Sequence, residues 1–146
     1  HQGEINFEDL EFENNFSGFN AYRQSKLGVI LLTRLISNTF QGKFKIVCQH
    51  PGVVRTKLGR DANILSRIIF WLIGKSSKNG AETLIHLTNI PFSNIKSGEY
   101  YSNSTVAKTT TYSYQLSIAK RLLTRISELL LLKANYKLNN INNYSS

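Results

Sequence analysis

The sequence of 146 residues contains no methionine, a single cysteine and only two prolines. Because the chain opens at His1 and holds no Met, we expect it to be part of a longer protein. The lone Cys48 cannot form a disulfide within the chain, which excludes a disulfide scaffold and fits a reducing compartment. No apolar run reaches the roughly 18–20 residues that a membrane-spanning helix needs.

Acidic residues are few and unevenly distributed. Nine Asp and Glu stand against 18 Lys and Arg, which gives a formal net charge of +9, and five of the nine acids lie in residues 1–13. Such a basic chain suggests a phosphate-rich cofactor, an anionic membrane surface or a nucleic acid, or else simply a solvated surface. No run exceeds two adjacent bases and no nucleic-acid-binding module is recognisable, so we expect no nucleic-acid partner.

Hydrophobic spacing predicts helices that alternate with short strands, and an apolar share of 41% is enough for a packed core. The predicted helices cover residues 20–39, 62–74, 78–89 and 113–132, and the predicted strands cover 44–48 and 98–102. This order indicates an α/β fold with a parallel sheet. Two strands cannot form such a sheet alone, so we expect further strands outside this sequence. The Asn-rich residues 133–146 are expected to be a disordered tail.

Tyr22 and Lys26 are four residues apart on the first predicted helix, which places both side chains on one face. A tyrosine is a poor base near neutral pH, but a nearby ammonium group favours its ionised form. The pair can therefore act as a general acid/base with its own activator. Taken alone, the same spacing also fits a half-buried Tyr beside a surface Lys.

The segment His50 to Thr56 reads HPGVVRT and follows the first predicted strand. Pro51 and Gly52 turn the backbone at the strand end, where ligands bind in parallel α/β sheets. The hydroxyl of Thr56 could bond a ligand amide. An ordinary strand-to-helix loop is the alternative.

Together these segments resemble the short-chain dehydrogenase/reductase family. AYRQSK (residues 21–26) is similar to its catalytic Tyr-x-x-x-Lys segment, and HPGVVRT is similar to its Pro-Gly-x-Val-x-Thr cofactor segment. The resemblance is strongest to the retinol-dehydrogenase-like branch, through FEDL (7–10), GAET (80–83) and SGEYY (97–101). It runs from residue 1 to about 132.

The resemblance implies the C-terminal part of a Rossmann-like, doubly wound parallel sheet, formed by residues 1–132. Tyr22 would exchange a proton with the substrate oxygen, and Lys26 would bind the nicotinamide ribose and favour ionised Tyr22. The nicotinamide carboxamide would be held by the backbone of three residues and one hydroxyl: Pro51, Gly52, Val54 and Thr56. Residues 57–75, which include Trp71, would be a substrate lid.

The implied activity is that of an NAD(P)-dependent oxidoreductase, with NADP preferred, acting on an apolar carbonyl or alcohol such as a retinoid or steroid. The family's Gly-rich phosphate loop is not in this sequence, so we expect the 146 residues alone to be inactive. A catalytically inactive binding or regulatory remnant of the same fold is the alternative.

Location and further ligands follow from the same resemblance. We expect a cytoplasmic protein, or one on the cytoplasmic face of an internal membrane and held there through an N-terminal segment outside this sequence; the oligomeric state stays open. The three histidines are too scattered for a recognisable metal site, so no metal is expected. His50 and Cys48 are expected to be structural strand residues.

Overall fold

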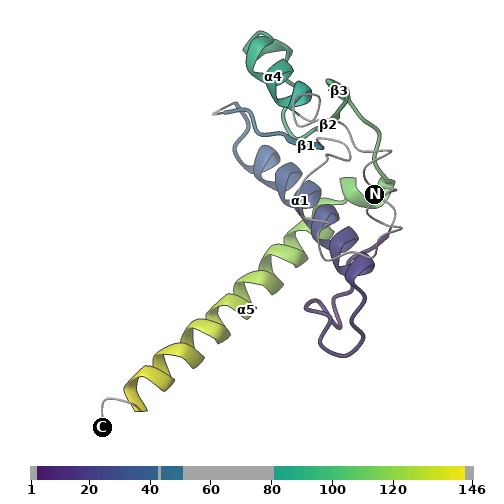
Figure 1. Ribbon diagram of the computed structural model, residues 1–146. Coiled ribbons are helices and arrows are strands. Elements are labelled where there is room, and N and C mark those ends of the chain that lie inside the picture. The colour runs from purple at the N-terminus through teal and green to yellow at the C-terminus, as the bar shows by residue number, and fades with distance from the viewer. Residues whose placement is uncertain (1–2, 43, 51–80, 144–146) are drawn as a thin grey trace. The chain divides into compact units, whose positions relative to one another are not determined.

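The computed structural model describes residues 3–42, 44–50 and 81–143, with side chains described as far as residue 134. The chain divides into two compact units. Unit 1 comprises His1–Leu35 and Thr110–Ser146, and unit 2 comprises Ile36–Thr109. The described elements are α1 (Gly18–Thr39), β1 (Cys48–His50), α4 (Glu82–Asn89), the 3-10 turn η2 (Phe92–Asn94), β2 (Tyr100–Ser102), β3 (Thr105–Val106), the 3-10 turn η3 (Thr111–Tyr114) and α5 (Leu116–Asn143). Figure 1 labels the α-helices and the strands.

Helix α1 has clear start and stop signals. Ser17 caps its first turn: the Ser17 hydroxyl accepts from the Asn20 amide at 3.4 Å, and the Ser17 carbonyl accepts from the Ala21 amide at 2.8 Å. The helix ends before Gly42, whose φ of +77° is a backbone conformation that favours glycine. The sequence prediction of a helix over residues 20–39 is confirmed.

The core of unit 1 lies between α1, α5 and the N-terminal segment. Buried residues recur at three- and four-residue steps along α1 and form one face of the helix. This face packs on Ala119 and Leu122 of α5. The buried cluster consists of Ile5, Leu27, Leu31, Leu35, Ala119 and Leu122. These burials fix which side of α1 faces the core, and therefore which side is exposed.

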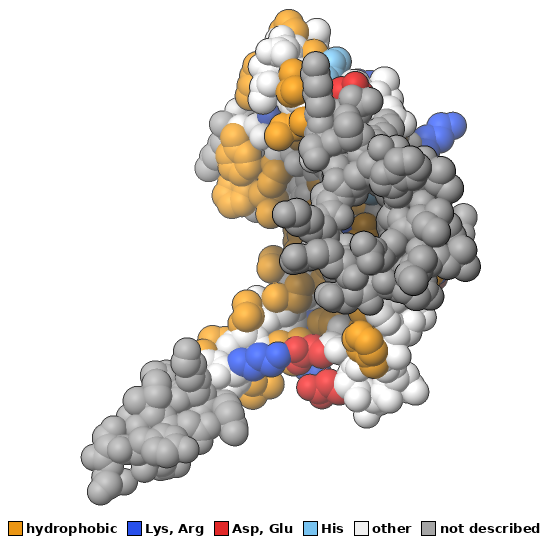
Figure 2. All heavy atoms as spheres, in the orientation of Figure 1, with side chains coloured by type: hydrophobic (Ala, Val, Ile, Leu, Met, Phe, Trp, Pro, Cys, Tyr) orange, Lys and Arg blue, Asp and Glu red, His pale blue; other side chains and the backbone are white. Residues whose placement is uncertain are grey.

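Charged contacts join the N-terminal segment to α5. The Glu8 carboxylate lies 4.0 Å from the Arg121 guanidinium, which also lies 4.0 Å above the Phe7 ring. Glu11 accepts a hydrogen bond from Lys133. Figure 2 shows acidic side chains next to basic ones on the face that it presents. The five acids near the N-terminus therefore pair partly within the chain.

Unit 2 holds a small mixed sheet with the strand order β1-β2-β3 among its described residues. Strands β1 and β2 are parallel, with Cys48 opposite Tyr100, and β2 and β3 form an antiparallel hairpin. Asn103 and Ser104 turn the hairpin with φ of 50° and 61°, the pattern of a two-residue type I′ turn. The Ser104 amide donates to Thr83 Oγ1 at 3.1 Å, which ties the hairpin to α4.

The structure differs from the sequence predictions at four places. The strand predicted over 44–48 begins at Cys48, although the Gly98 amide still donates to the Ile46 carbonyl at 2.7 Å; the Ile46 amide donates to the Ser97 hydroxyl at 3.1 Å and not to a backbone carbonyl. The predicted strand at 98–102 is realised over its last three residues, and β3 was not predicted. Helix α5 continues to Asn143, where a disordered tail was predicted from residue 133. No Pro interrupts that stretch, so the helix that starts at Leu116 can propagate through it.

Two of the predicted helices lie partly or wholly outside the described residues. The helix predicted over 62–74 lies outside the described residues. The one predicted over 78–89 is observed from Glu82 and ends at Asn89, two residues before Pro91.

Candidate functional site

Helix α1 presents Tyr22 and Lys26 on its exposed side. Leu27, Ile30 and Leu31, further along the helix, are buried, whereas the residues nearer its start include exposed positions at Tyr22, Ser25 and Lys26. Tyr22 is 52% exposed and Lys26 is also exposed. The predicted catalytic pair therefore lies in the first half of α1, where both side chains are exposed.

The two side chains lie together on that face. The Lys26 ammonium nitrogen is 5.5 Å from the centroid of the Tyr22 ring, within the range of a cation–π interaction. Side chains on a helix lean toward its N-terminus, and this brings Lys26 over the ring one turn earlier. The structure thus brings together the predicted phenol and ammonium.

Ser25 has a local role between them. Its hydroxyl donates to the Tyr22 backbone carbonyl at 2.8 Å. Such a bond to the preceding turn is the usual local partner of a Ser hydroxyl within a helix. The Ser25 hydroxyl therefore bonds the backbone of Tyr22 and not its phenol.

The charge of α1 is of one sign. The helix contains Arg23, Lys26 and Arg34 and no Asp or Glu; Arg34 is buried, so Arg23 and Lys26 supply the charge of the exposed side. A surface with only positive charges attracts anionic ligands. The exposed side of α1 therefore offers a phenol and an ammonium group, both hydrogen-bond donors, on a positively charged surface.

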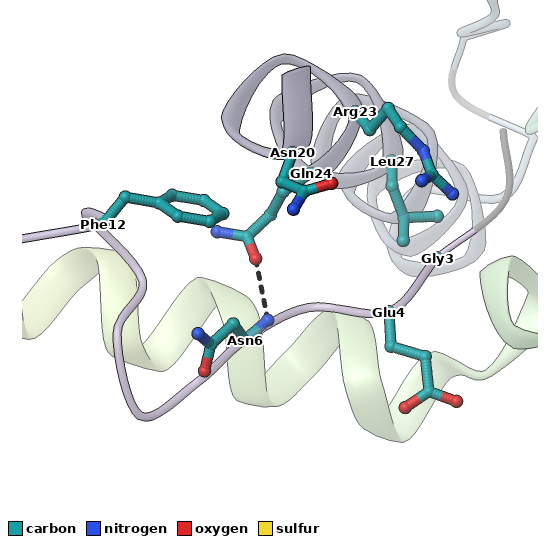
Figure 3. Close-up of a pocket in the computed structure, with 8 residues that line it drawn as sticks. All are labelled: Gly3, Glu4, Asn6, Phe12, Asn20, Arg23, Gln24 and Leu27. Carbon is teal, nitrogen blue, oxygen red and sulfur yellow. Dashed lines mark hydrogen bonds between the residues drawn. The ribbon is translucent and has the colours of Figure 1, made fainter. Parts of the chain in front are cut away.

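A shallow pocket of about 260 Å³ lies between the N-terminal segment and the same helix. Figure 3 shows Gln24 of α1 reaching the backbone of Asn6, with Arg23 and Leu27 nearby. The Asn6 amide donates to Gln24 Oε1 at 2.7 Å, and Gln24 Nε2 donates to the Leu10 carbonyl at 3.0 Å. Gln24 therefore holds the N-terminal segment against the helix that carries Tyr22.

Asp9 organises the loop that leads into α1. Its carboxylate accepts from the backbone amides of Glu13 at 2.8 Å and of Asn14 and Asn15 at 3.2 Å each. The sequence analysis named Asp9 only within the FEDL segment and did not single out Gln24. An Asp or Asn that begins a turn often bonds the next backbone amides, so the spacing of Asn6 and Asp9 was the available signal for this ordered loop.

The other predicted site residues are not placed with the pair. Pro51, Gly52, Val54, Thr56 and the lid at 57–75 lie outside the described residues. His50 ends β1 and Cys48 begins it, and both are half-buried strand residues.

The described residues contain neither a candidate metal cluster nor a candidate membrane-spanning helix. Over 3–42, 44–50 and 81–143, no group of three or more His, Cys, Asp or Glu is arranged to hold a metal ion. In the same part of the chain, no helix has the length and apolarity needed to cross a bilayer.

Comparisons with known proteins point to one group. No family model matches the chain. Retinol dehydrogenase 14 of Mus musculus is 34% identical over 127 residues, which covers 82% of this chain and 38% of the relative. Retinol dehydrogenase 12 of Homo sapiens is 35% identical over 106 residues, 70% of this chain and 34% of the relative. Retinol dehydrogenase 13 of Homo sapiens is 35% identical over 109 residues, 68% of this chain and 33% of the relative.

The aligned part spans little more than a third of the length of these relatives. Several of them agree in name and in the share of this chain that they cover. They agree with the resemblance found in the Tyr-x-x-x-Lys segment, whose two residues lie together on α1. The chain belongs to the short-chain dehydrogenase/reductase family, in its retinol-dehydrogenase-like branch.

Proposed function

We propose that the native protein is an NAD(P)-dependent oxidoreductase that transfers hydride between the nicotinamide and the carbon of a carbonyl or alcohol substrate. The observation that carries this proposal is the Lys26 ammonium, 5.5 Å from the centroid of the exposed Tyr22 ring, in a chain of this family. The relatives' names support oxidoreductase chemistry on retinol.

Tyr22 is the proposed general acid/base. In reduction, its hydroxyl gives a proton to the carbonyl oxygen as the carbon receives the hydride, and in oxidation it takes the alcohol proton. When bound, the nicotinamide cofactor supplies or takes the hydride.

Lys26 has a proposed role as a hydrogen-bond donor to the nicotinamide ribose. Its ammonium has three donors, so it can serve the ribose while it remains beside Tyr22. Pro51, Gly52, Val54 and Thr56 are proposed to hold the nicotinamide carboxamide. The cofactor is NADP or NAD, and the all-basic α1 favours binding of either phosphate-bearing form.

The proposed fold is a Rossmann-like, doubly wound parallel sheet to which β1 and β2 belong. The parallel pairing of Cys48 with Tyr100 supports it, because a parallel pair needs a long crossover connection. Residues 1–132 are proposed to be the C-terminal half of this domain. Ligands of such sheets bind beyond the carboxyl ends of the strands.

An apolar substrate of the retinoid class is proposed on the names of the relatives. The exposed side of α1 carries Phe19 at 70% and Val29 at 51% exposure on either side of Tyr22, so apolar surface is available next to the phenol.

The test is kinetic and uses the full-length native protein with NADPH and retinal. We expect Tyr22→Phe to lower kcat/KM by about 10³-fold, within the range for removal of a general acid. Lys26→Met should lower it as well and should also weaken cofactor binding. Both side chains are exposed, so the thermal midpoint should change little.

Ser25→Ala is the matched control on the same turn. Its hydroxyl bonds the Tyr22 carbonyl, so we expect kcat/KM to change by only a small factor. Full turnover by Tyr22→Phe would refute the role of the phenol. Binding of NADPH by the native protein without any turnover would instead support an inactive binding remnant of the fold.

A further inference from the structure

Two phenylalanines stand exposed at the end of α1 that carries Tyr22. Phe16 is 78% exposed and Phe19 is 70% exposed, the two highest values given for large apolar side chains in the described residues. Leaving such rings in water forfeits the free energy that burial of apolar surface gives. Two exposed aromatic rings therefore lie close in sequence to the proposed general acid/base, Tyr22.

The rings lie on the side toward which Tyr22 leans. Helical side chains cover the turn that precedes their own Cα, so the Tyr22 ring extends toward the first turn of α1. Phe19 lies three residues earlier on the same side of the helix. The edge of the Phe16 ring lies 3.9 Å from the position that a Cβ of Gly18 would take, so this ring rests against the first residue of α1.

Lys26 occupies the other side of Tyr22. Its ammonium covers the Tyr22 ring from the following turn. Since Lys26 is the proposed ribose ligand, the cofactor approaches from that side. The N-terminal side, where Phe16 and Phe19 lie, is left for the substrate.

The segment that carries Phe16 is ordered by its own hydrogen bonds. The Asp9 carboxylate accepts three backbone amides, and the Phe12 amide donates to the Asp9 carbonyl at 3.1 Å. Gln24 bonds the same segment at Leu10, and the Ser17 hydroxyl bonds the helix start. Phe16 is thereby presented from a built loop between Asp9 and Ser17.

Phe19 is also held in place. The Arg23 guanidinium carbon lies 5.4 Å from the centroid of its ring, on the next turn of α1. A cation stacked on one face of a ring restricts its rotamers and leaves the other face for an apolar contact. Both rings are therefore positioned, and each is solvent-facing.

We propose that Phe16 and Phe19 form the wall of the substrate site that receives the apolar body of the substrate, while Tyr22 meets its oxygen. This inference rests on the proposed function, and it names specificity-determining residues for it. Asp9 is a positioning residue, because it acts through the loop that carries Phe16.

The experiment compares a large apolar aldehyde with a small one on the full-length native protein. KM and kcat are measured with NADPH for retinal and for propanal, in Phe16→Ser, Phe19→Ser, and the conservative Phe16→Leu and Phe19→Leu. We expect each Ser variant to raise KM for retinal by about tenfold, because one well-packed ring contact is lost. KM for propanal should change by less than about twofold. The Leu variants should recover most of the affinity.

Leu131→Ser is the matched control. Leu131 is 66% exposed on α5, so the change removes a comparably exposed apolar side chain outside the proposed wall. We expect it to leave both substrates unchanged. Equal losses for retinal and propanal in the Phe variants, or an unchanged KM for retinal, would overturn the inference.

A binding measurement separates this inference from the proposed catalysis. Retinol binding is followed by retinol fluorescence in the Tyr22→Phe background, where turnover is not needed. Weaker binding in Phe16→Ser or Phe19→Ser supports the wall even if Tyr22 proves dispensable for turnover. If the Ser variants bind retinol normally but unfold at lower temperature, the rings pack against protein and the inference is wrong.

Discussion

The guanidinium carbon of Arg34 lies 3.5 Å from the centroid of the Tyr114 ring, although Arg34 is only 7% exposed. The same guanidinium donates to the Ser113 carbonyl at 2.9 Å and to the Ser113 hydroxyl. The hydroxyl of Ser113 in turn donates to the Thr110 carbonyl at 2.7 Å. Arg34 therefore fixes the 3-10 turn η3, which precedes α5, onto helix α1.

Removal of this contact should destabilise unit 1. Arg34→Met keeps the apolar stem but leaves the Ser113 carbonyl without the guanidinium donor, so we expect a loss of about 1–3 kcal/mol in the free energy of unfolding. Arg34→Lys should lose most of the same amount, because an ammonium lacks the planar fork and stacks poorly. Urea denaturation of the full-length protein measures both. Tyr114→Phe keeps the stacked ring and is the control, with little expected change.

Gly28 and Gly42 should respond in opposite directions to alanine. A Cβ on Gly28 would lie 3.5 Å from Leu122 Cδ2, an ordinary contact inside the α1–α5 packing. Gly28→Ala should therefore raise the free energy of unfolding by about 0.5–1 kcal/mol through helix propensity. A Cβ on Gly42 would meet no atom within 4 Å, but the φ of +77° at Gly42 is unfavourable for alanine. Gly42→Ala should therefore lower the free energy of unfolding by about 1 kcal/mol. Thermal or urea unfolding of the two variants gives the sign of each change in the free energy of unfolding. Changes of the same sign in both variants would contradict the prediction.

Asp9→Ala should loosen the loop before α1. Three amides lose their acceptor, so we expect faster hydrogen exchange at Glu13, Asn14 and Asn15. Asp9→Asn keeps an oxygen acceptor and should keep part of the protection. Amides of Ile30 and Leu31, deep in α1, serve as the internal reference and should not change. Unchanged protection in Asp9→Ala would show that other contacts hold the loop.

The contact of Lys133 with Glu11 should make stability depend on pH in the alkaline range. The hydrogen bond to Glu11, followed by its charge, raises the pKa of Lys133 above its ordinary value of 10.5. A pKa raised in the folded state stabilises the protein below the unfolded pKa, and the effect is lost as the pH rises through the folded value. Lys133 is exposed, so the effect should be small and weakened by salt.

The measurement is the difference in thermal midpoint between the native protein and Glu11→Gln, followed from pH 8 to beyond the raised pKa. We expect a small positive difference at pH 8 that vanishes at the alkaline end and in 1 M salt. A difference that grows with pH would contradict the assignment.

Elements with local signals could be predicted from the sequence. Helix α1 has a Ser cap, an apolar face with helical spacing and a glycine stop, so its bounds were predicted within two residues. The Tyr22–Lys26 pair followed from the same spacing, because residues four apart on a helix are neighbours. These features depend on residues that are close in the sequence.

Features set by distant partners could not be predicted in the same way. The extent of β1 depends on its pairing with β2, which is distant in the sequence. The burial of Arg34 depends on Ser113 and Tyr114, which no sequence spacing connects to it. The ordering of the acidic N-terminal segment depends on Gln24, Arg121 and Lys133 as partners.

The hairpin of unit 2 also implies an order of assembly. Its two strands are joined by Asn103 and Ser104, both already in the left-handed conformation, and such hairpins form in about 1–10 μs. The pairing of Cys48 with Tyr100 must close a much longer stretch of chain, and loop closure becomes entropically costlier and contact formation slower as separation grows. The antiparallel edge of this sheet is therefore expected to nucleate first and to offer β2 as a ready template, so that the parallel strand docks late in folding.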